Sequence, residues 1–242
     1  RRWPSLIYPM LQKVDWFALQ SPSHEARFAD LGVDHSRMTV TGSIKYDQHL
    51  PEDLEDRKAQ LGGLFQGRRI LMAASTHPGE EQLLLEVYQA LKPEIPDLVL
   101  VIAPRHIQRN AAIEKLVLQN KLRLTSFSRQ GRLTTDQDVY LLDAMGELVY
   151  FYAVSEIAFV GGSMIPRGGH NFMEAALAGT VIVCGDSLYN FEAIAEQFQE
   201  AGAMVTVENS DQLRIEIRAL LLDLDRRAKM QASALQTVLK HR

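Results

Sequence analysis

The chain has 242 residues, of which 46% are hydrophobic and 23% charged, a balance typical of a globular protein with one large α/β domain or two small ones. A formal net charge of −4 argues against a general nucleic-acid binder, because such proteins neutralise phosphates with a broad cationic surface, but it leaves room for a local cationic site for one or two phosphates. The single cysteine, Cys184, excludes a disulfide framework and a cysteine metal site.

The amino-terminal stretch, "RRWPSLIYPM", has neither an initiator methionine nor a signal-peptide pattern, so we interpret the chain as a part of a longer protein. The most apolar stretch, residues 148–162, is interrupted by Glu156 and by glycines before it reaches the roughly 18 residues that a membrane span needs. We therefore expect no membrane span. Cys184 lies in the apolar run "TVIVC", which indicates a buried thiol in a reducing compartment.

The first elements are short. Residues 15–20 predict a strand, and residues 21–32 predict a helix with Ser21 or Ser23 as its N-cap and Gly32 at its end. Residues 38–42 predict a second short strand, and residues 51–63 predict an exposed helix.

From residue 68 onward, short apolar runs alternate with helical patterns. The predicted strands are 68–75, 97–104, 122–127, 138–144, 156–162, 180–185 and 203–208. The predicted helices are 79–92, 108–120, 146–155, a helix beginning at His170–Asn171, 189–201, and one long amphipathic helix from about Asp211 to the end. Continuous apolar strands that are each followed by a helix indicate a Rossmann-like, doubly wound parallel α/β sheet from about Tyr46 onward.

Four strand-to-helix junctions combine polar residues with glycine: "ASTHPGEE" (74–81), "APRH" (103–106), "DAMGE" (143–147) and "GGSMIPRGGHNFME" (161–174). Ligands of doubly wound sheets bind at the carboxyl ends of the strands. We therefore expect these four loops to converge on one ligand.

The first two junctions carry candidate anion-binding residues. Ser75, Thr76 and His77 either meet an anion at the positive end of the following helix, or Ser75 or Thr76 caps that helix. The guanidinium of Arg105 either forks onto phosphate oxygens or pairs with a surface carboxylate. His106 is best interpreted as a solvated or capping histidine.

The third and fourth junctions carry candidate nucleoside-binding residues. Around Met145, Gly146 and Glu147, a glycine lets the backbone approach a planar base, although a plain tight turn is the simpler interpretation. Glu174 suits the two hydroxyls of a ribose, whereas Asn171 as N-cap with Glu174 three residues later would form a capping box. The glycines at 161, 162, 168 and 169 favour ligand binding, because a capped helix does not require them.

Other patterns are weaker. The glycines of 161–169 do not give the dinucleotide fingerprint, and residues 63–69 lack the Lys-Ser/Thr pair of a phosphate-binding loop. The acidic pairs at 136–138 and 223–225 are assigned to solvated surface, the second within a continuous helix. We expect no metal and no cofactor.

Four motifs in chain order, "ASTHPGEE", "APRH", "DAMGE" and "GGHNFMEAALAG", resemble the carboxyl-terminal half of the bacterial 3-deoxy-D-manno-octulosonic acid (Kdo) transferases. The stretches "HEARFADLGV", "TVTGSIKYD" and "NFEAIAEQFQEAGAMV" agree with the same family. The resemblance covers nearly the whole chain and implies a GT-B glycosyltransferase whose carboxyl-terminal domain, here residues 46–242, binds the donor CMP-Kdo. It implies that CMP is held by Pro104, Arg105, Met145, Gly146, Glu147, Asn171, Phe172, Met173 and Glu174. Ser43 departs from the asparagine that is usual in the family.

The resemblance also implies the reaction. Family members transfer Kdo to a lipid A precursor at the cytoplasmic face of the inner membrane, without a metal. Their general base is a glutamate of the amino-terminal acceptor domain, of which residues 1–45 would be the tail, so no catalytic base is assigned here. Arg105 would support the transition state, and this chain alone would bind donor without transferring it. Membrane contact would come from the amino-terminal half.

Two other functions fit the same residues. One is a transferase or epimerase of the same architecture that uses a UDP-sugar. The other is a nucleotide-binding module without an activity of its own.

Overall fold

The computed structural model describes residues 4–42, 44–129 and 133–240, so the predicted departure at Ser43 lies outside the described residues. The chain divides into two compact units: the first comprises the residues up to Gln48 together with those from Leu239 onward, and the second comprises His49–Val238. That they are the tail of an acceptor domain, residues 1–45, and a donor-binding domain, residues 46–242, stays a prediction.

The first unit is built around a two-stranded parallel sheet. It contains α1 (Pro4–Leu11), β1 (Phe17–Leu19), α2 (Pro22–Asp30), η1 (His35–Arg37), β2 (Met38–Val40) and η2 (Ile44–Tyr46). Phe17 lies beside Met38 in the sheet, and both side chains are buried in a small core. Ser21 is the N-cap of α2, because its hydroxyl accepts the backbone N–H of His24 at 3.3 Å. Gly32 follows the helix with φ +83°, so the predicted end is confirmed.

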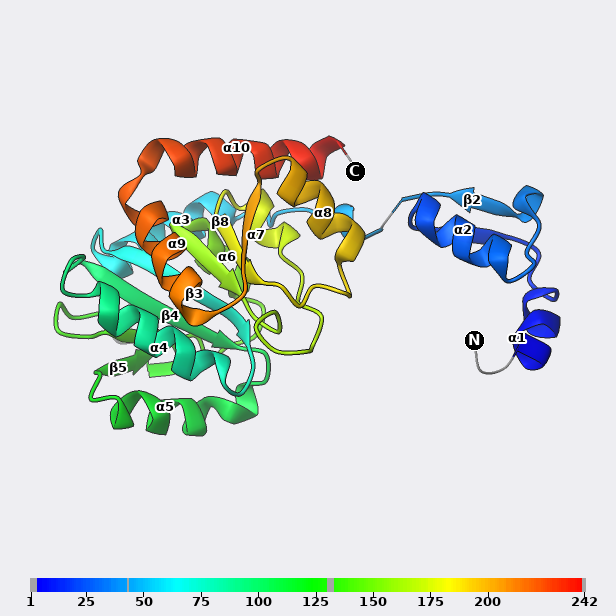
Figure 1. Cartoon of the computed structure of the whole chain (residues 1–242). Helices are drawn as coiled ribbons and strands as arrows, with labels where there is room; N and C mark the ends of the chain where they lie inside the picture. Colours follow the sequence, from blue (N-terminus) through cyan, green and yellow to red (C-terminus); the bar gives the residue numbers. More distant parts are fainter. Residues whose placement is uncertain (1–3, 43, 130–132, 241–242) are drawn as a thin grey trace. The chain divides into compact units, whose positions relative to one another are not determined.

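The second unit contains a seven-stranded parallel sheet (Figure 1). Its strands are β3 (Arg69–Thr76), β4 (Leu98–Pro104), β5 (Leu124–Ser126), β6 (Val139–Leu141), β7 (Ile157–Val160), β8 (Val181–Gly185) and β9 (Met204–Val207), in the order β5-β6-β4-β3-β7-β8-β9. The predicted doubly wound parallel sheet is confirmed. Strands β4 to β6 lie on one side of β3, and strands β7 to β9 lie on its other side. The strand order therefore reverses between β3 and β7, the place where such folds form a ligand crevice.

Helices cover both faces of this sheet (Figure 1). They are α3 (Leu54–Phe65), α4 (Glu80–Leu91), α5 (Asn110–Gln119), α6 (Leu148–Ala153), α7 (Met173–Leu177), α8 (Glu192–Glu200), α9 (Ser210–Leu222) and α10 (Leu224–Lys240), with short turns η3 (Ile107–Arg109) and η4 (Phe127–Arg129). Val139 and Leu141 of β6 join the core formed with α4, α5 and α9. Tyr140, between them, packs on the opposite face against Phe65 of α3 and Phe151 of α6.

Two helix predictions were wrong in detail. The helix predicted as exposed over 51–63 is α3, and it buries Leu54, Leu61 and Phe65. The long carboxyl-terminal helix is two helices, because Asp223 is extended (φ −110°, ψ 93°) and its carboxylate accepts the backbone N–H of Arg226 at 2.8 Å. Residues 223–225 therefore lie at a junction and not within a continuous helix.

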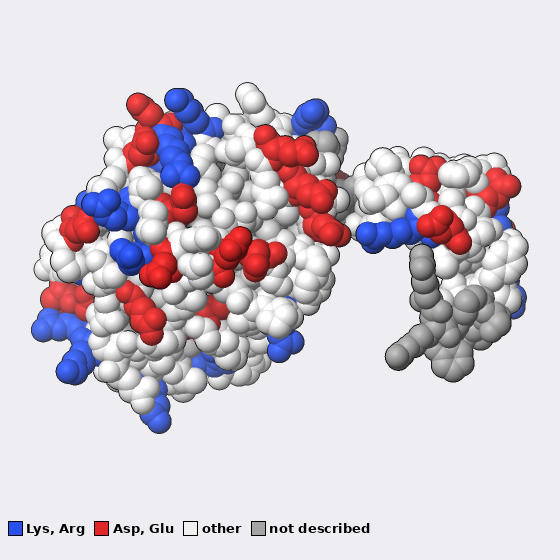
Figure 2. All heavy atoms as spheres, in the orientation of Figure 1, with Lys and Arg blue, Asp and Glu red and all other residues white. Residues whose placement is uncertain are grey.

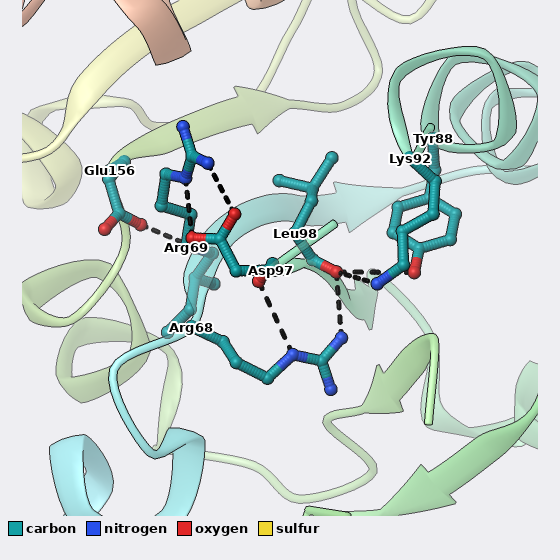
Figure 3. A network of polar contacts seen from close by, with 8 residues as sticks. Arg68, Arg69, Tyr88, Lys92, Asp97, Leu98 and Glu156 are labelled. Atoms are coloured by element: carbon teal, nitrogen blue, oxygen red, sulfur yellow. Dashed lines mark hydrogen bonds and ion pairs between the residues drawn. The ribbon is translucent and has the colours of Figure 1, made fainter. Parts of the chain in front are cut away.

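Polar side chains connect the amino-terminal ends of three neighbouring strands of the sheet (Figure 3). Arg69 of β3 forms an ion pair with Asp97, while Arg68 donates to the backbone oxygen of Leu98 at 2.8 Å. Glu156, just before β7, accepts the N–H of Ile70 at 2.5 Å. These contacts fasten the starts of β3, β4 and β7 to one another, at the end of the sheet opposite the candidate loops.

The thiol of Cys184 is fully buried in β8, as predicted, and burial raises its pKa. On the face shown in Figure 2, basic and acidic side chains are interspersed, and acidic side chains gather over α8, whose exposed acids are Glu192, Glu196 and Glu200. Within the described ranges, each helix is too short or too polar to cross a bilayer.

Candidate functional site

A cavity of about 290 Å³ opens at the carboxyl ends of β3, β4 and β6. Five of the predicted site residues line it, together with His106, Ile107 and Leu148 among others: Ser75, Pro104, Arg105, Met145 and Gly146. The structure thus brings three of the four predicted loops together. The fourth loop, residues 161–174, does not line this cavity.

Arg105 presents an exposed side chain to the cavity. Its backbone N–H donates to the backbone oxygen of Thr76 at 3.0 Å, which ties the β4 loop to the β3 loop. Among the described residues, no carboxylate lies within ion-pair distance of its guanidinium. The structure therefore does not support the alternative that Arg105 pairs with a surface carboxylate, and it leaves this cation available to a ligand.

The "DAMGE" loop exposes backbone at the cavity. Gly146 has φ +82° with open space where a Cβ would lie, and the side chain of Met145 is 81% exposed. Glu147 does not line the cavity, because its carboxylate forms an ion pair with Arg57 of α3. A direct contact of the Glu147 side chain with a ligand in this cavity would require breaking that pair.

Ser75, Thr76 and His77 differ in what they expose. Ser75 lines the cavity with φ +54°, whereas Thr76 is fully buried and its hydroxyl donates to Glu81 at 2.8 Å. The N-cap of α4 is Gly79, without a side-chain bond, so the interpretation that Ser75 or Thr76 caps the helix is wrong. The buried Thr76 hydroxyl is also closed to an anion.

Glu80 is a buried carboxylate whose partners the sequence did not reveal. It is 1% exposed, and its carboxylate accepts four backbone N–H groups. These come from His77 and Gly162, both at 2.9 Å, and from Ser163 and Met164, both at 3.1 Å. Glu80 thus fixes the glycine-rich loop after β7 to the loop after β3. The sequence offers only an acidic residue in the first turn of a helix, which the helix dipole already explains.

Asn171 and Glu174 lie at the start of α7 and form only part of a capping box. The Asn171 side-chain oxygen accepts the N–H of Met173 at 3.1 Å, and its amide donates to Glu174 at 3.5 Å. Phe172, not Asn171, is the N-cap. Burial raises the pKa of the half-buried Glu174, against the opposing effect of the Asn171 hydrogen bond.

Phe172 and Met173 cannot offer side chains to a ligand. Both are 0% exposed, and the Phe172 ring packs on Phe191 and Phe198 with centroids 5.6 and 5.1 Å apart. Any ligand contact at these two predicted positions must therefore use the backbone.

Two histidines connect the β3 and β7 loops. Nε2 of His77 lies 2.7 Å from Nε2 of His170, so one imidazole donates a hydrogen bond to the unprotonated nitrogen of the other. Burial, with the nearby charges of His77, Arg105 and His106, lowers the pKa of His170 to about 4, and burial also lowers the pKa of His77.

This pair makes stability dependent on pH. The pKa of His170 is about 4 in the folded chain and 6.5 when unperturbed, so between these values the unfolded chain binds more protons. We expect the free energy of unfolding to fall as the pH decreases from about 6.5 to about 4, by less than about 1.4 kcal/mol per pH unit for this group, because partial exposure screens it. Urea unfolding at several pH values measures the slope. His170→Gln should flatten it, and an unchanged slope in that variant would contradict the assignment.

A doubly wound parallel sheet with a cavity at the carboxyl ends of its strands defines the chain's class as a Rossmann-like α/β fold, the fold of the C-terminal domains of GT-B glycosyltransferases. The C-terminal CMP-Kdo binding domain of WaaA from Acinetobacter baumannii shares this fold with a TM-score of 0.73 and 29% identity, covering 78% of this chain and 99% of that one. A glycosyltransferase from Rickettsia africae has the same fold at 16% identity, with a TM-score of 0.65 over 100% of this chain and 62% of its own.

Residues 1–48 match the family model described as 3-Deoxy-D-manno-octulosonic-acid transferase (kdotransferase). The 3-deoxy-D-manno-octulosonic acid transferase of Haemophilus influenzae is 31% identical over 238 residues, which are 98% of this chain and 56% of the relative. The chain is therefore homologous to the Kdo transferases over almost its whole length, as its motifs predicted. It spans about half the length of that relative.

Proposed function

We propose that this chain is the donor-binding part of a glycosyltransferase that uses CMP-Kdo, and that the cavity at the ends of β3, β4 and β6 receives the CMP. The observation that carries the proposal is that Arg105, which forms no ion pair with a described carboxylate, lines this cavity together with the open backbone of Gly146. A guanidinium without a carboxylate partner suits a phosphate, and open backbone next to an exposed Met145 suits a flat base.

The roles of the individual groups follow from their environments. Arg105 would bind the phosphate, while Pro104, Met145 and the backbone of Gly146 and Glu147 would hold the nucleoside. Asn171 and Glu174, which lie outside the lining of this cavity, would bind the ribose hydroxyls, with Phe172 and Met173 contributing backbone. The amino end of α4 offers no further anion site, because Glu80 already accepts the N–H of His77 there.

The rest of the reaction belongs to a complete transferase. We propose that Kdo passes to a lipid A precursor at the cytoplasmic face of the inner membrane, without a metal, and that the general base lies in an amino-terminal acceptor domain. On this proposal the chain alone binds donor and transfers nothing.

Titration of the chain with CMP, UMP and NAD tests the nucleotide. We expect saturable CMP binding that exceeds the binding of both other nucleotides, because the base would be recognised at the Gly146 backbone. Tighter binding of UMP would favour a UDP-sugar enzyme instead. Binding of CMP without transfer, even after the chain is joined to the amino-terminal part of a Kdo transferase, would favour a nucleotide-binding module.

Glu174→Gln tests the ribose site in the same titration. We expect CMP affinity to fall by about 5- to 10-fold, the loss of a charge-assisted hydrogen bond, while the melting temperature stays unchanged. Glu192→Gln, on the exposed first turn of α8, is the matched control and should bind CMP normally. If Glu174→Gln instead lowers the melting temperature and leaves CMP affinity intact, the residue serves the helix start and not the ligand.

A further inference from the structure

A row of five cationic or imidazole side chains extends from the CMP cavity to the glycine-rich loop after β7. It consists of Arg105, His106, His77, His170 and Arg167, and we call it the basic row. Arg105 and Arg167 are both exposed, and neither forms an ion pair with another described residue. The neighbouring Arg109 is different, because Glu81 already neutralises it.

Ring contacts make the row continuous. His106 lines the cavity, and its ring meets the His77 ring edge-on at 5.9 Å between centroids. His77 then contacts His170 through the 2.7 Å hydrogen bond between their Nε2 atoms. The row thereby crosses from the β4 and β3 loops to the β7 loop, at the place where the strand order reverses.

Gly162 lets the last two members approach each other. A Cβ at this position would lie 3.0 Å from the His170 ring and 3.6 Å from Cβ of Arg167, and the backbone has φ +69°. Glu80 holds this glycine in place through its backbone N–H. The loop is therefore built to carry His170 and Arg167 side by side.

Among the residues that the structure describes, no carboxylate forms an ion pair with either arginine of the row. Glu80 is the carboxylate near His77, and its oxygens already accept four backbone N–H groups. The two histidines lose protons readily, since burial and the nearby arginines lower their pKa values. The remaining charge is that of Arg105, which acts on His170, and of Arg167, which acts on His77, so both cations lie near the histidine pair. The row is therefore suited to a ligand with two anionic groups close together.

We propose that the basic row is a second anion subsite, in which Arg167 and His170 bind the carboxylate of an acidic sugar while Arg105 binds the phosphate. This inference rests on the proposed function. In a nucleotide-linked ulosonic acid, the phosphate oxygen and the carboxylate are bonded to the same carbon, so two anions enter together. A neutral hexose donor brings no carboxylate, and the subsite therefore selects donors whose sugar is an acid.

The test compares Arg167→Ala with the unchanged chain, using CMP and freshly made CMP-Kdo as the two ligands. We expect the unchanged chain to bind CMP-Kdo more tightly than CMP. Arg167→Ala should lose about 10- to 100-fold in CMP-Kdo affinity, the effect of one charge-assisted contact, and bind CMP within twofold of the unchanged chain. Arg167→Lys, which keeps the charge, should retain an intermediate affinity for CMP-Kdo.

Each result separates the subsite from the proposed function. The control is Arg218→Ala, which removes an arginine of α9 that is already paired with Glu94. This variant should bind both ligands normally. If Arg167→Ala binds CMP-Kdo as tightly as the unchanged chain, the subsite is disproved while CMP binding stands. An equal loss of CMP and CMP-Kdo affinity would also disprove it, since Arg167 would then serve the nucleotide. If the unchanged chain binds neither ligand, the proposed function fails and the inference fails with it.

Discussion

In a complete transferase containing this chain, we expect Arg105→Ala to lower kcat by about 100- to 1,000-fold, the loss that follows removal of one preorganised donor to a developing anion. As CMP departs, negative charge grows on its phosphate oxygens. On the proposed function, the Arg105 guanidinium would meet that charge, because none of the described carboxylates forms an ion pair with it. Its main chain is fixed by the bond to the Thr76 oxygen, which holds the base of this side chain at the cavity wall.

Initial rates of Kdo transfer at saturating donor measure this effect, and a CMP titration of the chain alone separates binding from turnover. Arg123→Ala is the control, because Arg123 is an exposed arginine paired with Asp136 beyond the cavity lining. It should keep normal rates. Arg105→Ala with kcat within threefold of the unchanged enzyme would rule out the phosphate role.

The architecture was predictable because the strands are continuous apolar runs. Such runs are buried on both faces of a parallel sheet, and parallel strands all end on one edge, so the convergence of three loops followed from topology alone. The break between α9 and α10 was not predictable in the same way. It depends on one residue, Asp223, whose carboxylate caps the next helix, and the apolar periodicity continues across it.

Side-chain direction at the site was less predictable, and the β3 loop shows why. The register of β3 with β4 shifts between Ala74 and Thr76, where Ser75 has φ +54°. This irregularity interrupts the alternation of side chains, so that Ser75 faces the cavity and Thr76 faces Glu81. A sequence pattern assumes regular alternation and cannot reveal such a shift.

Long-range partners were hidden for a related reason. Glu147 belongs to a motif that resembles a nucleotide-binding loop, yet its carboxylate pairs with Arg57, 90 residues away. Glu80 accepts backbone N–H groups from a loop more than 80 residues later. In both cases the two partners are far apart in the sequence, and no local motif links them. Backbone N–H donors are present at every residue except proline, so the sequence does not show which of them a carboxylate will bind.

Glu80→Gln should lower the free energy of unfolding by about 3 kcal/mol or more. The carboxylate oxygens of Glu80 accept N–H groups in two pairs, His77 with Gly162 and Ser163 with Met164. Glutamine replaces one oxygen by an NH₂ group, which turns donors toward one of these pairs and leaves buried N–H groups without acceptors. Hydrogen bonds to a charged group are worth about 1.5 to 3 kcal/mol each, and an unsatisfied buried donor costs about 1 to 3 kcal/mol.

Urea unfolding measures this loss, with Glu86→Gln as a control on the exposed side of the same helix, where a change below about 0.5 kcal/mol is expected. Because Glu80 also positions Gly162, the variant that remains folded should lose the preference for CMP-Kdo over CMP more than it loses CMP binding itself. Glu80→Asp keeps the charge but has a shorter side chain. It should likewise lose the preference for CMP-Kdo more than it loses CMP binding. A Glu80→Gln chain as stable as the unchanged one would mean that the glycine-rich loop holds its shape without this carboxylate, and the basic row would then need another support.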